Sequence, residues 1–238
     1  MFTFEMSSES KPRQRAAHQL PPGRHGLSRD FVEANQRERI LDAVADVTSL
    51  VGYASMSVED IISAAGVSRR TFYDNFKSKE DAFLTAYEEI GSEAFRRVRA
   101  AYAGSDTFAH GVIACLAEFL EFAAAEPRYA DMCIVEVLVA GQAAIERRNS
   151  VMKVLAELLH AGAQTIPGAV HPPALVAETI IGGMYEIIYS RVLEGRTAEL
   201  VDLLPELAYA MMLPYLGHEV AQREVASARP TTPSAPAP

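Results

Sequence analysis

The sequence predicts an all-α fold, in which an N-terminal three-helix module precedes a larger helical domain, with about nine helices in total. Two observations predict it. Apolar residues recur at helical spacing from residue 31 to residue 215, and no convincing run alternates apolar and polar residues as a β-strand does. Serines at expected helix starts and glycines at expected helix ends divide the first part of the chain into short helices, and longer helices follow in the second part.

The composition is that of a folded chain and not of a disordered one. Of the 238 residues, 49% are hydrophobic and 22% are charged. The net charge of −9 is unevenly placed: residues 1–79 hold 11 Lys and Arg against 10 Asp and Glu, which leaves 11 against 21 for residues 80–238. The acidity therefore belongs to the second part, and an N-terminal module is free to approach phosphates.

The first helix is predicted over residues 31–51, where Ile40, Val44, Val47 and Val51 share one face. Gly52 ends it. Three serines then stand where helix N-caps are expected. Ser57 begins a second helix, with Asp60 in the place of a capping-box acid, and Gly66 ends it. Ser68 begins a third helix over 69–75, and Ser78 begins a fourth over 79–103.

Five further helices follow in the second part. One opens at Asp106, a short one has Pro127 in its first turn, and one begins near residue 142. Another follows Pro172 and Pro173, and the last carries Pro205 in its first turn.

The two ends have a different composition. Residues 1–28 mix Pro, Ser, Gln and Gly with basic residues and predict a flexible basic arm, and residues 222–238 predict a disordered tail. We find no secretory signal, and the longest uncharged stretch, 158–177, is broken by three prolines and does not suit a membrane span. We expect a cytoplasmic protein. The arm either reaches a DNA minor groove or is simply solvated.

Residues 57–79 are the most informative stretch and read SVEDIISAAGVSRRTFYDNFKSK. Two helices this short do not persist alone in water, so they must pack on each other and on the first helix. The turn at Gly66 between them predicts a helix-turn-helix. The exposed side of the third helix then holds arginines, hydroxyl groups and an amide, which suit phosphates and base edges in a major groove.

This stretch resembles the TetR family of regulators, over about residues 31–84. The family pattern is close to "sv.dIa.aAGvs.gtfY.hF.sKe.L". The matching residues are Ser57, Val58, Asp60, Ile61, Ala64, Ala65, Gly66, Val67, Ser68, Thr71, Phe72, Tyr73, Phe76, Ser78, Lys79 and Glu80. Arg70 and Asn75 depart from the pattern, where many members have Gly and His, and both can still donate hydrogen bonds. Ala82 stands where Leu is common.

The resemblance implies which residues meet DNA. They are Ser57, Arg69, Arg70, Thr71, Tyr73, Asn75 and Lys79, with Ser57 and Lys79 on phosphates. Ser68 is expected to cap the third helix and not to read bases. Tyr73 has a second interpretation, as an aromatic ring packed on the fourth helix.

The resemblance also implies a working cycle: a homodimer binds a palindromic operator in double-stranded DNA, and a small-molecule effector releases it. The apolar and aromatic composition of the body suggests that this effector is hydrophobic. The expected domains are residues 29–80 for DNA binding and 81–221 for effector binding and dimerisation. The dimer surface is expected on the last two helices, and ordinary core packing within one chain is the other interpretation of their apolar stripes. Their apolar stripes are Gly182, Gly183, Met184, Ile187 and Ile188, and Leu203, Leu204, Leu207 and Met211.

The effector residues stay unknown. Eight candidates for the lining of its pocket are Phe95, Phe108, Phe119, Phe122, Tyr129, Met132, Met152 and Tyr185, and four polar candidates are His110, Glu136, Gln142 and His160. For each of them ordinary core packing or a satisfied polar contact is the commoner role.

Other functions receive less support. Asp106 with His110 and Glu157 with His160 have helical ligand spacing, but each pair stands alone, so no catalytic or metal site is assigned. We expect no enzyme, no cofactor and no membrane partner. An effector-free DNA binder would need stronger overall basicity. A transcription activator with the same module stays open beside the repressor.

Overall fold

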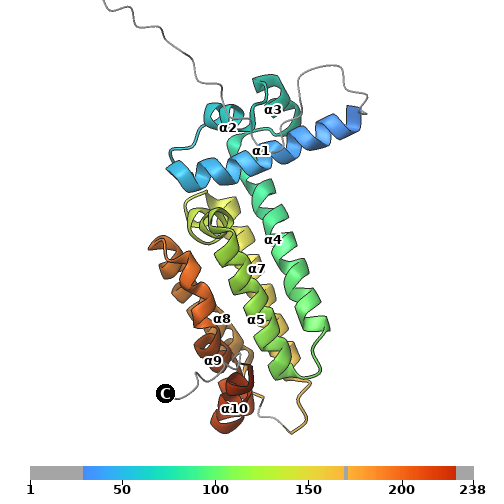
Figure 1. Ribbon diagram of the computed structural model, residues 1–238, viewed down its shortest axis with the longest axis vertical. Coiled ribbons are helices and arrows are strands. Elements are labelled where there is room, and N and C mark those ends of the chain that lie inside the picture. Colours follow the sequence, from blue (N-terminus) through green and yellow to red (C-terminus); the bar gives the residue numbers. More distant parts are fainter. Residues whose placement is uncertain (1–28, 169–170, 229–238) are drawn as a thin grey trace, which may run out of the picture.

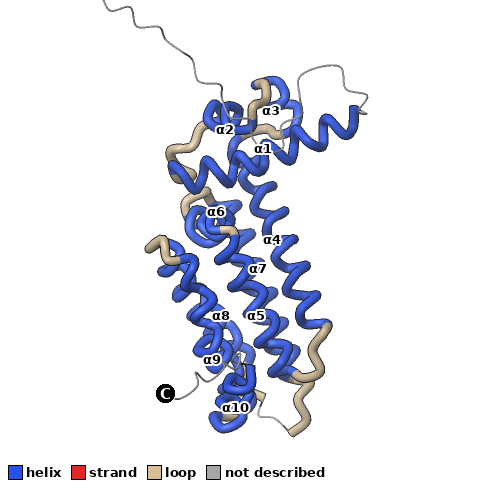
Figure 2. The backbone as a smooth tube through the Cα atoms, viewed as in Figure 1, coloured by secondary structure: helices blue, strands red, loops and turns tan. Residues whose placement is uncertain are grey.

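The computed structural model describes residues 29–168 and 171–228, and all the regular elements in these ranges are helices (Figures 1 and 2). The fold class predicted from the sequence is confirmed. The elements are α1 (Arg29–Val51), α2 (Val58–Ala65), α3 (Arg69–Asn75), α4 (Lys79–Ala103), α5 (Phe108–Ala125), α6 (Pro127–Ala130), η1 (Asp131–Val135), η2 (Glu136–Leu138), α7 (Gln142–Ala163), α8 (Ala174–Leu193), η3 (Thr197–Leu203), α9 (Leu204–Leu216) and α10 (His218–Ala228).

The first three helices form the predicted module, and each boundary has a local cause. Ser57 and Asp60 make both bonds of a capping box at the start of α2. Gly66 ends α2 with φ +62, a left-handed conformation that glycine adopts without strain. Ser68 then accepts a hydrogen bond from the backbone N–H of Thr71 and caps α3, as predicted. The arm assigned to residues 1–28 lies outside the described residues.

The helices stand in an elongated arrangement. Figure 1 shows α1 lying across one end of a set of long helices, with α2 and α3 beyond it, while α4 runs from this module along the length of the body. A displacement at the far end of α4 can therefore be carried to the module by one continuous helix.

The core of the module reaches beyond the predicted boundary at residue 80. Ile40, Val44 and Phe72, all fully buried, share one apolar cluster with Phe83 of α4. The same cluster continues into the body through Met132 and through residues of η2 and α7. The helix-turn-helix is thus completed by the first turns of α4 and by the η1–η2 region, and residues 29–80 do not contain their whole core.

The body has its own apolar core, built by one side each of α5, α7, α8 and α9. Leu120, Leu200 and Met212 are fully buried in it. By length and composition α5 is apolar enough to cross a membrane, the one such helix among the described residues. It packs against α4, α9 and η3, and this central position in the body accounts for its apolar sequence.

Two boundaries differ from the prediction. The N-cap of α5 is Thr107, whose hydroxyl accepts the backbone N–H of His110, and not Asp106. A tenth α-helix, α10, follows the predicted nine and continues to Ala228, seven residues into the segment 222–238 predicted as a disordered tail. This helix is short, with 11 residues, and carries few large apolar side chains that would mark it in the sequence. It packs on α5 and α9, buries Ala221 and half-buries Val225. Residues 229–238 lie outside the described part of the chain.

Gly91 lies in the interior of α4, and a Cβ placed there would meet nothing within 4 Å. Gly91→Ala is therefore expected to raise the free energy of unfolding by about 0.5–1 kcal/mol, because alanine loses less backbone entropy in a helix. Gly66→Ala is the control, since it forces a Cβ into a left-handed conformation and is expected to cost about 1–2 kcal/mol. Urea melts of both variants measure the change in the free energy of unfolding, which is expected to be positive for Gly91→Ala and negative for Gly66→Ala. A Gly91→Ala variant less stable than the wild type would contradict the expected gain.

Candidate nucleic-acid interface

Helix α3 has one buried side and one exposed side. Phe72 is fully buried and Phe76 nearly so, with 5.9 Å between their ring centroids. The opposite side carries the predicted DNA-contacting residues, of which Arg69, Arg70 and Tyr73 are exposed while Thr71 and Asn75 are half-buried. The structure therefore brings the predicted recognition residues together on one short helix, held from behind by two phenylalanines.

The two arginines of α3 pair only weakly within the chain. The Arg69 guanidinium lies 3.3 Å from the Glu59 carboxylate, and that of Arg70 lies 3.7 Å from Asp74. The Arg70 side chain is 90% exposed, so solvent screens its pair and the contact contributes little to stability. Both guanidinium groups are therefore available to phosphates or to guanine edges.

The polar side chains of α3 are partly used within the helix. The hydroxyls of Ser68 and Thr71 lie 2.8 Å apart, and Asn75 donates an amide hydrogen to the Thr71 carbonyl at 2.8 Å. The Tyr73 ring is half-exposed and meets Phe72 edge-on at 5.3 Å. This places Tyr73 at the surface, whereas its alternative interpretation was packing on α4.

Ser57 stands at the start of α2. Its hydroxyl donates to the Asp60 carboxylate at 2.6 Å, and this bond, with the Ser57 backbone N–H, holds the pKa of Asp60 below its usual range. Asp60 is thus ionised beside the helix N-terminus. A phosphate that reaches Ser57 must share the hydroxyl with this carboxylate.

Lys79 is directed toward the backbone that joins α1 and α2. Its ammonium donates to the carbonyls of Tyr53 and Met56 at 2.9 and 2.7 Å and lies 4.5 Å from the centroid of the Tyr53 ring. Two of its three N–H groups are therefore used inside the protein. The sequence-based assignment of Lys79 to phosphate did not foresee this structural role, because both carbonyls lie more than 20 residues away.

Lys79→Met is expected to lower the free energy of unfolding by about 1–3 kcal/mol, since it removes two charge-assisted bonds. The salt dependence of DNA binding is expected to stay unchanged, because the ammonium is used within the fold. Loss of one phosphate contact would instead reduce the slope of log K against log salt by about 0.9. Urea melts and titrations of a DNA fragment at several salt concentrations separate the two roles.

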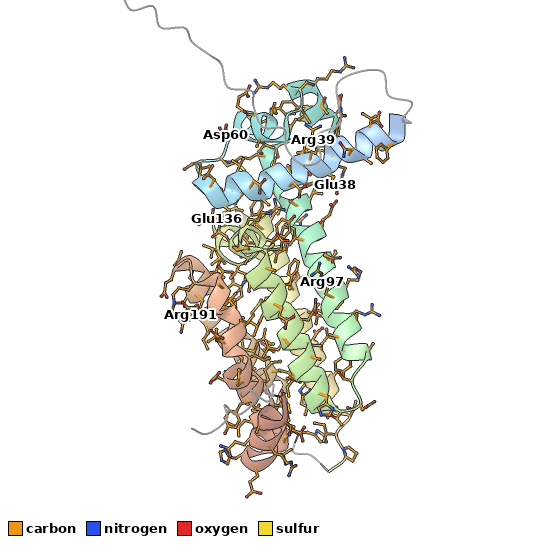
Figure 3. The ribbon with its side chains drawn as sticks, in the orientation of Figure 1. Glu38, Arg39, Asp60, Arg97, Glu136 and Arg191 are labelled. Carbon is orange, nitrogen blue, oxygen red and sulfur yellow. The ribbon has the colours of Figure 1, made fainter. Side chains whose placement is uncertain are left out.

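Arg39 is a residue of the module that sequence reasoning missed. From α1 it donates to the carbonyls of Ala65 and of Gly66, the latter at 2.9 Å, where α2 ends (Figure 3). These carbonyls have no partner within their own helix, so a cation is favourable there. No local pattern pairs Arg39 with a helix end 26 residues later. It ties α1 to the turn of the helix-turn-helix.

Polar bonds join the module to the body beneath α1. The Tyr53 backbone N–H donates to the Glu136 carboxylate at 2.6 Å, and Figure 3 places Glu136 just below α1. Arg128 pairs with Asp46 at 2.6 Å, and the Tyr129 hydroxyl donates to Asp42 at 3.1 Å. Glu136, a candidate for the effector pocket, is thus committed to the junction.

Asp131 lies in η1, one turn of π-helix near this junction. Burial, and then the charge of Glu136, raise the pKa of Asp131 to about 6 from an ordinary 3.8. The folded state therefore holds this proton more tightly than the unfolded chain does, so the contribution of this group to stability is full below pH 4 and is lost as the pH rises to about 6.

Asp131→Asn is accordingly expected to be more stable than the wild type at pH 7.5, by about 1 kcal/mol once screening by solvent is allowed for. The difference should shrink as the pH falls from 6 toward 4, because the wild-type carboxyl then becomes neutral. Urea melts at pH 7.5 and 4.5 measure it. An advantage of equal size at both pH values would contradict the assigned cause.

The predicted dimer stripes divide between core and surface. Ile188 and Leu207 are 4% exposed and belong to the core of the body. Met184, Leu203, Leu204 and Met211 are half-buried against the same core. The exposed members are Gly182, Gly183 and Ile187, all on α8. Leu175 and Leu193 of α8 and Ala210 and Leu213 of α9 are exposed as well. Ile188 and Leu207 therefore follow the other interpretation of these stripes, as core of the single chain.

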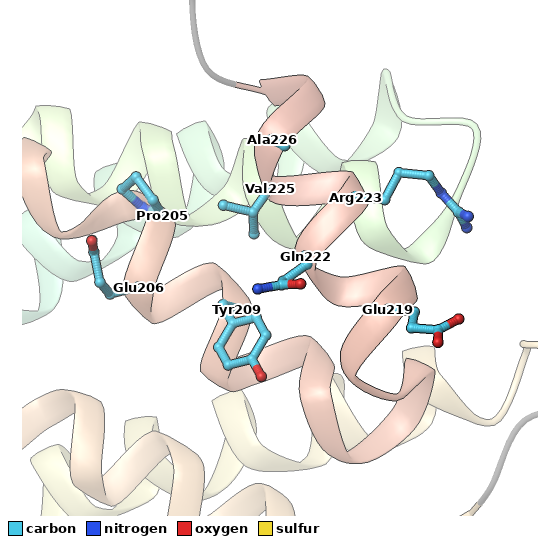
Figure 4. A pocket seen from close by; sticks show the side chains of 8 residues that line it. All are labelled: Pro205, Glu206, Tyr209, Glu219, Gln222, Arg223, Val225 and Ala226. Atoms are coloured by element: carbon cyan, nitrogen blue, oxygen red, sulfur yellow. The ribbon is translucent and has the colours of Figure 1, made fainter.

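The candidates for the effector pocket are mostly packed. Met132 is fully buried between module and body, and Tyr129 points to α1. Phe95 is 37% exposed. A surface groove of about 770 Å³ lies elsewhere, between α9 and α10, where Tyr209 and Val225 face it (Figure 4). None of the residues proposed from the sequence to line the effector pocket borders this groove.

Among the described residues no three or more His, Cys, Asp or Glu side chains are grouped to hold a metal ion. Cys115 and Cys133 are free thiols. Burial raises their pKa values, to about 11 for Cys115 and about 12 for Cys133, so both are protonated at neutral pH.

Comparison with known proteins agrees with this geometry. Residues 40–86 match the family of bacterial regulatory proteins described as the tetR family. No curated protein matches the chain.

Solved structures share the fold at low sequence identity. The fatty acid degradation regulator FadR from Bacillus halodurans has a TM-score of 0.66 and 21% identity, with 74% of this chain and 94% of that chain covered. FadR from Bacillus subtilis, in complex with stearoyl-CoA, has 0.64 and 21%, with 76% and 98% covered. A TetR-like regulator from Rhodococcus sp. RHA1 has 0.63 and 22%, with 80% and 97% covered.

Proposed function

We propose a specific function for this chain, which by its N-terminal module is a member of the TetR family of transcriptional regulators. It is a repressor that binds a palindromic operator as a homodimer and leaves it when a small molecule binds the helical body. The observation that carries the proposal is α3, a helix of seven residues. Phe72 and the following Phe76 are buried behind it, and Arg69 and Arg70 are exposed in front with only weak ion pairs. We place its action in the cytoplasm, on double-stranded DNA.

The proposed DNA contacts follow the exposure of the side chains. Arg69 and Arg70 offer guanidinium forks to phosphate or guanine, and Tyr73 offers a half-exposed hydroxyl. Thr71 and Asn75 add a methyl group and an amide at the same surface. Ser57 contacts a phosphate at the start of α2, whereas Lys79 supports this surface from within by binding the carbonyls of Tyr53 and Met56.

Dimerisation follows from the size of the module. One recognition helix makes too few base contacts for strong specificity, and two-fold symmetry doubles them. The exposed side of α8, with Gly182, Gly183 and Ile187, allows close approach of a second copy. Since a Cβ at either glycine would meet nothing within 4 Å, this surface is open in the monomer.

The effector is proposed to bind among α4, α7 and α8. The FadR structure that holds stearoyl-CoA has the same fold, and this suggests an apolar molecule for the present chain. A ligand there releases the operator only if it binds the state that does not fit DNA more tightly than the state that does. Helix α4 connects this region to the module.

The first test uses the purified chain and the DNA upstream of its own gene. We expect a saturable mobility shift that weakens steeply with salt and resists competitor DNA. Light scattering in the same buffer is expected to give the mass of a dimer. Genomic binding in cells covers operators elsewhere, and absence of any specific site in both assays would overturn the proposal. A target gene that falls silent when the chain is deleted would indicate activation.

A further inference from the structure

Arg148 is a half-buried cation in the body for which the described residues provide no acidic partner. It lies on α7, and its guanidinium carbon is 3.8 Å from the centroid of the Tyr185 ring on α8. It donates from Nη1 to the side-chain oxygen of Asn149 at 3.0 Å. Burial raises the pKa of Tyr185, and a hydrogen bond from Arg148 opposes that rise. The Nε of Arg148 is buried and has no hydrogen-bond partner. The neighbouring Arg147, in contrast, pairs with Glu88 at 2.5 Å.

An unpaired guanidinium in such a place is costly, because burial removes water from the charge and no carboxylate replaces it. The Tyr185 ring compensates in part through its π face. The edge of the fork that carries Nε is the one that binds carboxylates or phosphates with two parallel hydrogen bonds. The Arg148 charge has no carboxylate partner, and its Nε–H has no acceptor. A ligand with a carboxylate or phosphate could supply both.

The surroundings are aromatic and come from several elements. Tyr189 stacks on Tyr185 at 6.3 Å, and the Tyr185 hydroxyl donates to the Ile134 carbonyl at 2.6 Å. The charge also acts on Tyr87 of α4. Burial raises the pKa of Tyr87 far above its usual value, and the positive charge of Arg148 opposes this rise. Because Tyr87 belongs to the module's core and Tyr185 packs on the body's core, Arg148 lies where the two meet.

We propose that Arg148 binds the oxyanion of the effector, a carboxylate or phosphate carried by an organic molecule whose remainder lies against Tyr185 and Tyr87. The inference rests on the proposed function and names the chemistry of its ligand. An anion on Arg148 neutralises this charge, which acts electrostatically on Tyr87 of α4, a residue of the module's core. Ligand binding is thereby coupled to the module through Tyr87.

The test compares ligands that differ only in the anionic group, by calorimetric titration of the full chain. The probes are decanoate, decyl phosphate and the neutral decan-1-ol, with 2-naphthoate and 2-naphthol as an aromatic pair. At least one anion is expected to bind roughly tenfold or more tightly than its neutral match, as charge-assisted bonds predict. Decanoate against decyl phosphate tells which oxyanion is preferred. Failure of all three anions to bind would overturn the proposal.

Three variants decide whether Arg148 is responsible. Arg148→Gln is expected to abolish the preference for the anion, Arg148→Lys to keep part of it, and Arg147→Gln, the matched control, to keep all of it. A purely structural arginine would lower the Tm when replaced, whereas a ligand-binding one should leave the Tm of Arg148→Gln equal or higher, because an unpaired charge is removed. An anion preference that survives in Arg148→Gln would refute the assignment.

Operator binding keeps this result separate from the proposed function. Without ligand, Arg148→Gln should bind operator DNA as the wild type does, and decanoate or decyl phosphate should release only the wild type. If the wild type binds no DNA, the proposed function fails whatever the probes do. If it binds DNA but shows no anion preference, the inference alone fails.

Discussion

Alanine at both Arg70 and Tyr73 is expected to lower operator affinity by at least roughly a hundredfold and to leave the Tm almost unchanged. Each good base or phosphate contact contributes about 1–3 kcal/mol, and in a dimer every loss occurs twice. The Arg70 side chain is 90% exposed and Tyr73 is 49% exposed, so the main packing lost is the edge contact of Tyr73 with Phe72. Fluorescence anisotropy with a labelled operator fragment measures the affinity, and a thermal melt measures the fold.

The control is an equivalent pair far from α3. Arg223 of α10 is 67% exposed and Tyr102 at the end of α4 is 47% exposed, so Arg223→Ala with Tyr102→Ala removes the same chemistry elsewhere. This control should keep the affinity of the wild type. Equal losses in both double variants would mean that the effect is general charge and not recognition. Full affinity in the α3 variant would remove α3 from the interface.

The recognition helix is predictable because its causes are local. Ser68 and the two aromatic residues of α3 lie within nine positions of each other, and the observed bounds of α3 are those predicted from them. The same holds for α4, which Ser78 caps and which runs over the predicted residues 79–103. Exposure of Arg69 and Arg70 then follows from the burial of the opposite side.

What escaped prediction depends on contacts between distant segments. Lys79 turned to the carbonyls of Tyr53 and Met56, and Arg39 to the end of α2, because the fold leaves those carbonyls without partners. The sequence around Arg148 also does not predict that its Nε is buried or that its guanidinium lies over the Tyr185 ring. Such contacts exist only after the helices have packed.

The apolar stripes of α8 and α9 show a related limit. A stripe seen in sequence tells that one side of a helix is covered, but not whether the cover is the same chain or a second copy. Ile188 and Leu207 are covered by their own chain, and Gly183 and Ile187 are not. Only the residues left exposed after folding are candidates for the dimer.

Phe83→Ala is expected to cost about 3–5 kcal/mol and to abolish operator binding near the growth temperature, although Phe83 is buried and touches no DNA. Sequence places Phe83 in the effector domain. In the structure it is fully buried in the core of the module and meets Tyr53 edge-on at 4.8 Å. Without its ring, α1 loses its support on α4. Urea melts, operator titrations and hydrogen exchange of the amides in α1–α3 measure these effects.

Leu120→Ala is the matched control, since Leu120 is equally buried but belongs to the core of the body. It is expected to cost about 2–5 kcal/mol, and its faster hydrogen exchange should be confined to α5 and its neighbours. Operator affinity measured below the melting transition should be retained. Faster exchange confined to the body in Phe83→Ala as well would contradict the division into two cores.

The position of the boundary between the two cores decides how effector binding in the body changes DNA binding by the module. If Phe83→Ala loosens α1–α3, the module and the first turns of α4 are one cooperative unit, and a ligand needs only to move Tyr87, one turn beyond Phe83, to act on it. If a chain of residues 29–80 folds and binds DNA alone, the unit ends before α4, and release must come from a change in the distance between two rigid modules. The shared core, with Phe72 and Phe83 both fully buried in it, favours the first result.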